Sequence, residues 1–70
     1  MARLHKRSLR IAGHRTSLAL EAEFWAALEE IAARDGLTLT ALVAQVDAGR
    51  AERGLASALR VYALCALAQR

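Results

Sequence analysis

Basic side chains at the start of the chain are the first candidates for chemistry. Five of them precede Glu21, the first acidic residue: Arg3, Lys6, Arg7, Arg10 and Arg15. The remainder of the chain has five basic and seven acidic residues, and the 70-residue chain carries a formal net charge of +3. Two copies together would carry twice this charge. We therefore expect the basic segment to attract a polyanion and to contact phosphates through Arg3, Lys6, Arg7 and Arg10.

No arrangement typical of an enzyme is found. The sequence lacks a serine, histidine and carboxylate set, a phosphate-binding glycine loop and a metal-binding motif. His5 and His14 have no companion ligands. Cys65, the only cysteine, is expected to be a buried and inert thiol because its neighbours are apolar. We therefore predict no enzymatic activity, no metal and no cofactor.

Residues 14–20 alternate between two faces, as a strand requires. Leu18 and Leu20 are expected to point inward, while Arg15, Ser17 and Ala19 point outward. Residues 1–13 are interpreted as a basic N-terminal arm or a short extended piece. Because no second convincing alternating run exists, this strand is expected to pair with the same strand of a second copy.

Three helices are expected after the strand. The first extends from Glu21 to Arg34 and ends at Gly36, and the second begins after Thr38, its predicted cap, and continues to about Asp47. A polar linker over residues 49–56 precedes a C-terminal helix over residues 57–70, with Ser57 as its predicted cap. This last helix is apolar on more than one side, so it is expected to be buried on two sides.

Size and hydropathy indicate that the chain needs a partner. A chain of 70 residues seldom buries enough apolar surface alone, and one cysteine cannot form an intrachain disulfide. We therefore expect a homodimer that shares a core, with the C-terminal helix available for a higher oligomer. The expected dimer core consists of Leu18, Leu20, Phe24, Leu28, Ile31 and Val43. No apolar run approaches a membrane span and no signal peptide is evident, so a cytoplasmic location is expected.

An ordered set of residues resembles the ribbon-helix-helix family, which contains the Arc and MetJ repressors. The resemblance covers residues 14–48 through the stretch 15–20, then Glu23-Phe24-Trp25 and Leu28, then Ala32, Gly36-Leu37-Thr38-Leu39-Thr40 and Leu42-Val43. The run 11–17 and the stretch Ser57-Ala58-Leu59-Arg60-Val61 resemble a bacterial subgroup with an added helix. The implied fold is mainly α-helical, with one strand that pairs across a dimer, two helices and a third C-terminal helix.

The resemblance also implies a function. Two paired strands would enter the major groove of double-stranded DNA, where Arg15, Ser17 and Ala19 read base edges. The amides around Thr38, Leu39 and Thr40 would meet a phosphate. For Thr38 itself, helix capping and phosphate contact both remain open. The expected function is that of a transcriptional repressor.

Two alternatives remain open. The first is the antitoxin of a toxin–antitoxin pair, although the short apolar C-terminal helix differs from a long acidic toxin-binding tail. The second is a protein-interaction module on the same fold. Ala19 offers no hydrogen bond to a base, which keeps the second alternative open.

Overall fold

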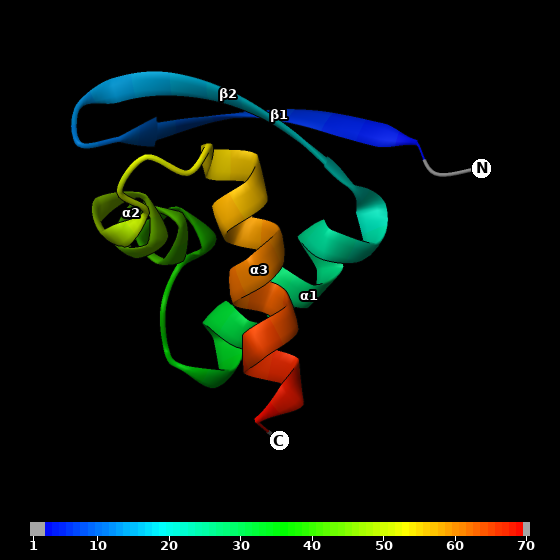
Figure 1. The fold of residues 1–70 in the computed structure, drawn as a ribbon. Helices are drawn as coiled ribbons and strands as arrows, with labels where there is room; N and C mark the ends of the chain where they lie inside the picture. Colours follow the sequence, from blue (N-terminus) through cyan, green and yellow to red (C-terminus); the bar gives the residue numbers. More distant parts are fainter. Residues whose placement is uncertain (1–2, 70) are drawn as a thin grey trace.

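The computed structural model describes residues 3–69, which form a β-hairpin followed by three helices (Figure 1). The hairpin lies across one end of the helices, and α3 extends away from it (Figure 1). The expected fold class, mainly helical with a third C-terminal helix, is confirmed. The elements are β1 (Leu4–Ile11), β2 (His14–Glu21), α1 (Ala22–Arg34), α2 (Leu39–Gly49) and α3 (Leu55–Ala68).

The hairpin is the main difference from the sequence-based expectation. β1 occupies most of the segment expected to be an arm, and it pairs antiparallel with β2 from Leu4–Glu21 to Ile11–His14. The expectation that β2 lacks a strand partner in its own chain is therefore wrong. The two-residue connection has positive φ at both Ala12 (52°) and Gly13 (82°), as a type I′ turn requires. This turn has the backbone twist that joins adjacent antiparallel strands.

Local signals set the ends of α1 and the start of α2. Gly36, with φ of 70°, follows α1, and the Leu37 amide donates to the Ala32 carbonyl at 2.8 Å, which closes the helix end. The Thr38 hydroxyl accepts a hydrogen bond from the Ala41 amide at 3.0 Å. The predicted cap at Thr38 is thus confirmed.

α3 begins earlier than expected. Its N-cap is Gly54, which has no side chain to accept a hydrogen bond, and Ser57 lies within the first turn. The predicted cap at Ser57 is wrong, and the linker is shorter than residues 49–56. Leu55 and Ala56 pack against the core, so tertiary contacts favour the additional helical residues over a serine cap.

One core cluster draws buried apolar side chains from both strands and all three helices. The largest fully buried side chains come from every helix and from β2: Leu20, Trp25, Leu28, Ile31, Leu42, Val43 and Leu59. Most of the residues expected in a shared dimer core are among them, and Leu18 is only 5% exposed. Phe24 is partly buried. Ile11 of β1 and Leu59 of α3 also belong to this core, and a core shared with a second copy stays a prediction.

Trp25 connects the hairpin to α1. Its indole Nε1 donates a hydrogen bond to the His5 carbonyl at 2.8 Å. The Arg7 guanidinium lies 4.6 Å from the centre of the Trp25 ring and forms an ion pair with Glu29 at 3.2 Å. These contacts hold the inner side of β1 on the helical layer, since a buried indole nitrogen needs an acceptor.

Candidate nucleic-acid interface

The outer face of the hairpin gathers basic and hydroxyl side chains. Paired residues of antiparallel strands project to the same side, so the register assigns three cross-strand pairs to this face: Lys6 with Ala19, Ser8 with Ser17, and Arg10 with Arg15. All are exposed except Ala19, which is partly exposed. The expected outward orientation of Arg15, Ser17 and Ala19 agrees with this register. The face points away from the helices (Figure 1).

Arg10 and Arg15 lie directly opposite each other, one residue pair away from the pair that flanks the turn. Side chains at such positions have Cβ atoms about 5 Å apart, and like charges there destabilise a strand pair. Within residues 3–69, neither guanidinium forms an ion pair with a carboxylate. The pair therefore creates a local positive field that an anion would relieve.

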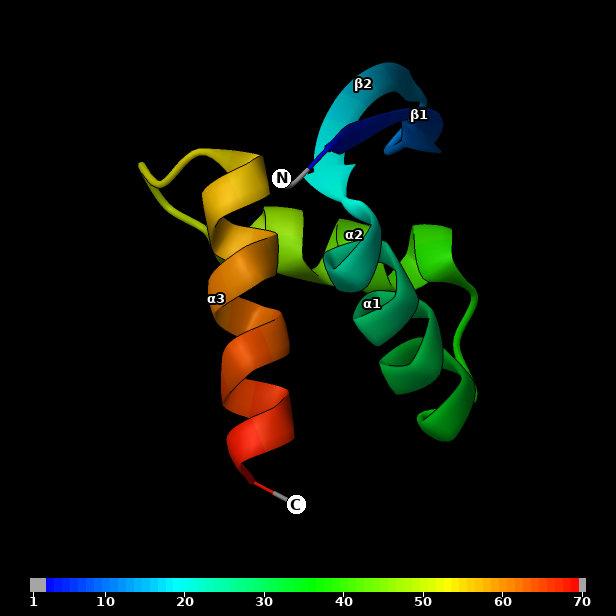
Figure 2. The same ribbon diagram turned by 90° about the vertical axis from the view of Figure 1, so that its right-hand side faces the viewer.

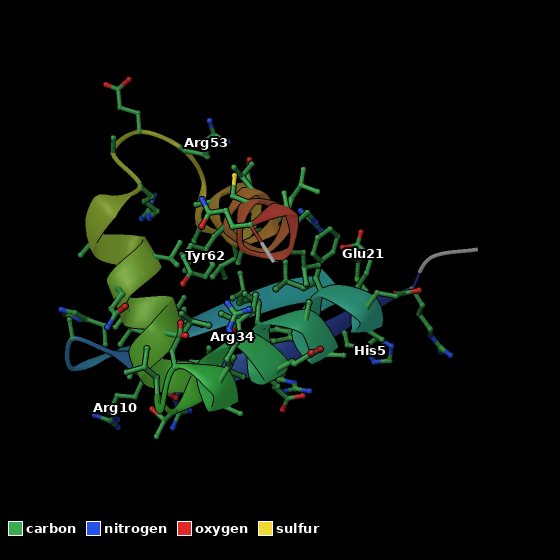
Figure 3. All side chains as sticks on the ribbon, turned by 90° about the horizontal axis from the view of Figure 1, so that it is seen from below. His5, Arg10, Glu21, Arg34, Arg53 and Tyr62 are labelled. Atoms are coloured by element: carbon green, nitrogen blue, oxygen red, sulfur yellow. The ribbon has the colours of Figure 1, made fainter. Side chains whose placement is uncertain are left out.

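Leu4 and Glu21 form the last cross-strand pair on this face, at the end of the hairpin opposite the turn. Arg60 of α3 binds the Glu21 carboxylate, with Nη2 at 2.9 Å and Nε at 3.0 Å from Oε1. A hydrogen bond from the Glu21 backbone and the bond from Arg60 hold the pKa of this carboxyl below its usual value of 4.5. Arg60 thus compensates the negative charge of the single carboxylate on this face. That carboxylate lies far from the Arg10–Arg15 pair. Figure 3 shows Glu21 and Arg10 at opposite sides of the molecule.

Two basic residues expected to contact phosphate occupy different places from the rest. Arg7 lies on the inner face, where Glu29 and Trp25 hold it, so it does not join Lys6 and Arg10. Arg3 is exposed and precedes β1. The structure brings the predicted base-reading residues together with Lys6 and Arg10 and separates Arg7 from them.

The N-terminus of α2 has two unused amides. The Ala41 amide donates a hydrogen bond to the Thr38 hydroxyl, and the Leu42 amide donates one to the Thr38 carbonyl. The amides of Leu39 and Thr40 have no acceptor in the described part of the chain. These amides carry the partial positive charge of the helix end. Capping by Thr38 is therefore compatible with an anion at this end. β1 also packs against α2, so the hairpin and this helix are neighbours in the fold.

Ser8 was not among the residues predicted from the sequence. Its position opposite Ser17 follows from β1, which the sequence analysis interpreted as an arm. The alternation of Lys6, Ser8 and Arg10 with Leu9 and Ile11 was the available signal.

Metal binding and membrane insertion each need a structural feature of their own. No group of three or more potential metal-ligating side chains is present within residues 3–69. In the same range, no helix combines the length and hydropathy needed to traverse a bilayer. Cys65 is exposed, so the expectation that it is buried is wrong: its position on α3 points away from the core.

Comparison with known proteins agrees with this architecture. The ribbon-helix-helix domain family matches residues 4–67, from the first residue of β1 to the last turn of α3. A solved structure, that of an uncharacterized protein from Bordetella pertussis Tohama I, is similar with a TM-score of 0.76 and 41% sequence identity. That match covers 90% of this chain but 54% of the other, so the chain spans about half the length of this relative. No curated protein matched.

The family match decides the assignment. Ribbon-helix-helix domains are in general regulators that bind DNA as dimers. The matched segment includes both strands and nearly all of the three helices. With so much of its length matched, the chain belongs to the ribbon-helix-helix family.

Proposed function

We propose that this protein is a transcriptional repressor that binds double-stranded DNA as a homodimer, with the outer face of the hairpin in the major groove. The Arg10–Arg15 pair carries the proposal, because two opposed guanidiniums on an exposed face favour a polyanion. A two-stranded ribbon also fits a major groove about 12 Å wide. DNA in a bacterial cell lies in the cytoplasm, so a cytoplasmic location is part of the proposal.

The contacts divide into two kinds. Arg15 can donate two hydrogen bonds to guanine, Ser17 and Ser8 can donate or accept, and Ala19 can contact a thymine methyl group. Phosphates would be bound by Lys6, Arg10 and Arg3, and by the amides of Leu39 and Thr40 beside Thr38. The first kind provides sequence preference, and the second provides affinity and orientation.

We propose a role for the strands that differs from the one expected from the sequence. Each chain has a complete two-stranded ribbon, so a groove can be filled by one chain. Edge-to-edge pairing of two hairpins would produce four strands spaced about 4.8 Å apart, and with its side chains such a sheet is wider than the groove. We therefore propose one hairpin per groove.

Selection from a random pool of duplexes would test the function. The parent protein should enrich a motif, and the double substitution of Arg10→Ala and Arg15→Ala should abolish the enrichment. Arg34→Ala is the matched control, since Arg34 ends α1 on the side of the molecule away from the hairpin (Figure 2). It should behave as the parent does. Equal binding by all three proteins would contradict the proposal.

One observation favours a second candidate. The outer side of α3 exposes Leu64 and Leu67, and an apolar helix face can bind another protein. If the parent bound no duplex at low salt, a protein-interaction module would be the better proposal. A toxin gene adjacent to the gene for this chain would favour the antitoxin alternative.

A further inference from the structure

A groove between α2 and α3 is lined by none of the residues proposed to contact DNA. It has a volume of about 570 Å³ and is bordered by both helices and by the loop that joins them. Sites for small molecules typically have volumes of roughly 300–1,000 Å³. Val46 of α2 and Ala58 and Val61 of α3 give the groove apolar walls. Its polar groups therefore decide which kind of small molecule it suits.

Arg50 borders the groove at the start of the loop. Its Nε donates a hydrogen bond to Asp47 Oδ1 at 2.6 Å, and its Nη1 donates one to the Arg53 carbonyl at 2.8 Å. The Arg53 amide in turn donates to the Arg50 carbonyl at 3.1 Å. These bonds close the loop around Ala51, whose φ of 56° is left-handed, and they hold the backbone of Arg53 beside the groove. The charge of Arg50 itself is compensated by Asp47.

The Arg53 side chain also borders the groove, and its charge is not compensated. Within residues 3–69 its guanidinium forms no ion pair. Glu52 precedes it in the chain but neither pairs with it nor lines the groove. None of the described residues that line the groove carries a carboxylate. The groove therefore has one excess positive charge, which favours a monoanion.

Tyr62 brings an aromatic ring and a hydroxyl to the groove from α3. The side chain is partly buried, and Figure 3 shows it between α3 and α2. Its hydroxyl has no hydrogen-bond partner in the part of the chain that the structure describes. No buried polar side-chain atom there lacks a partner, so this hydroxyl reaches solvent. Gln45 of α2 adds an exposed amide. A ring with free donors beside it suits a flat ligand that carries an acceptor.

We propose that the α2–α3 groove binds a small aromatic carboxylate. The planar Arg53 guanidinium can donate two parallel hydrogen bonds to a carboxylate, and one carboxylate matches the one excess charge. The aromatic body of the ligand would then lie against Tyr62 and the apolar walls, where ring stacking and the burial of apolar surface both stabilise it. This site goes beyond the proposed function and does not depend on it.

Two other anions fit the groove less well. A DNA phosphate would have to reach the loop, which Figure 2 shows in yellow on the far side of α3 from the hairpin. Inorganic phosphate could bind Arg53, but it would leave Tyr62 and the apolar walls in contact with water. Only an anion with an apolar body uses both parts of the groove.

Nuclear magnetic resonance of the full chain without DNA tests the site, because three aromatic residues report on three places. The chain has one tyrosine, one tryptophan and one phenylalanine. Tyr62 lines the groove, whereas Trp25 contacts the hairpin and Phe24 lies beside Arg60. Titration with benzoate should shift the Tyr62 ring signals to saturation and leave those of Trp25 unchanged. We expect a dissociation constant on the order of 1 mM, because a probe this small buries little surface.

Two matched probes separate the charge of benzoate from its shape. Benzamide has the shape without the charge, and inorganic phosphate has charge without the aromatic ring. Each should bind at least about tenfold more weakly than benzoate, because each loses one of the two kinds of contact. Equal binding of benzamide would show that Arg53 does not select an anion, and equal binding of phosphate would show that the aromatic body is not recognised. Either result would overturn the proposal.

Two arginine variants test the assignment of Arg53. Arg53→Gln removes the charge and should weaken benzoate binding at least about tenfold. Arg10→Gln removes the charge of an exposed and unpaired arginine of the hairpin, so it is the matched control and should bind benzoate as the parent does. An unchanged circular dichroism spectrum would show that both variants fold. Equal binding by Arg53→Gln and the parent, or Tyr62 signals that do not respond at about 20 mM benzoate, would overturn the proposal.

The outcomes for this site and for the proposed function can be told apart. The titrations contain no DNA, so a chain that binds duplex but not benzoate would refute only this inference. A chain that binds benzoate but no duplex would refute the proposed function alone.

Discussion

At the scale of single residues, the outer face of the hairpin separates side chains that can read a base from those that can only bind phosphate. Arg15→Ala should weaken binding to the selected motif by about 1–3 kcal/mol and relax the preference at one base pair, because a bidentate contact with guanine is lost. Lys6→Ala should weaken binding evenly across sequences, since a phosphate carries no sequence information. Fluorescence anisotropy with the selected and a scrambled duplex distinguishes these results. If Arg15→Ala left the base preference unchanged, the assignment of Arg15 as a reader would be wrong.

Glu21 gives the fold a dependence on pH. Its pKa is lower in the folded chain than the usual value of 4.5, through its own backbone hydrogen bond and Arg60. Such a carboxylate stabilises the fold above about pH 4.5, and the contribution is lost as the pH falls through the lower folded pKa. Between neutral pH and about pH 3, Glu21→Gln should therefore lose less thermal stability than the parent.

Glu52→Gln is the control for that titration, since Glu52 is exposed in the loop between α2 and α3. Its melting temperature should follow that of the parent across the same range. Equal acid sensitivity of Glu21→Gln and the parent would show that the bond between Glu21 and Arg60 does not contribute.

At the scale of elements, the sequence predicted those parts whose signals are local. Three features depend only on neighbouring residues: which side chains of β2 point outward, the glycine after α1 and the threonine cap of α2. All three agree with the structure. The pairing of β1 with β2 was missed because alanine, rather than asparagine or aspartate, precedes Gly13 in the turn. The start of α3 and the exposure of Cys65 depend on which side of α3 meets the core, which neighbouring residues do not reveal.

The turn itself provides a test of the hairpin. Ala12 has φ of 52°, a left-handed conformation that costs alanine about 1 kcal/mol or more. Asparagine tolerates this region, so Ala12→Asn should raise the free energy of unfolding by about 1 kcal/mol. Gly13→Ala should lower it, because Gly13 has φ of 82°. Urea denaturation measures both changes, and destabilisation by Ala12→Asn would argue against the intrachain hairpin.

α3 has one buried side and one exposed side, and two leucines distinguish them. Leu59 is completely buried, so Leu59→Ala should cost about 2–5 kcal/mol through lost contacts and a cavity. Leu64 is 66% exposed, and in dilute monomer Leu64→Ala should change the free energy of unfolding by no more than about 0.5 kcal/mol. Equal effects in urea denaturation would contradict the packing of α3.

At the scale of the whole molecule, basic charge and exposed apolar surface lie in different places, the first on the hairpin and the second mainly on α3. The five basic residues before Glu21 remain concentrated near the hairpin, whereas the helices carry most of the acidic residues. Affinity for DNA should therefore depend on salt mainly through Arg3 and the basic side chains of the ribbon.

The position of the basic residues predicts how the affinity for DNA changes with salt concentration. Each phosphate contact contributes about −0.9 to the slope of log K against log salt concentration. Arg3, Lys6 and Arg10 would thus give about −2.7 for one chain and about −5 for a dimer on two half-sites. Lys6→Ala, which removes one phosphate contact from each chain of the dimer, should reduce the parent slope by about 2 on the same duplex, whereas Arg34→Ala should leave the slope unchanged. Equal slopes for Lys6→Ala and the parent, measured by anisotropy from about 50 to 200 mM salt, would show that Lys6 does not contact a phosphate.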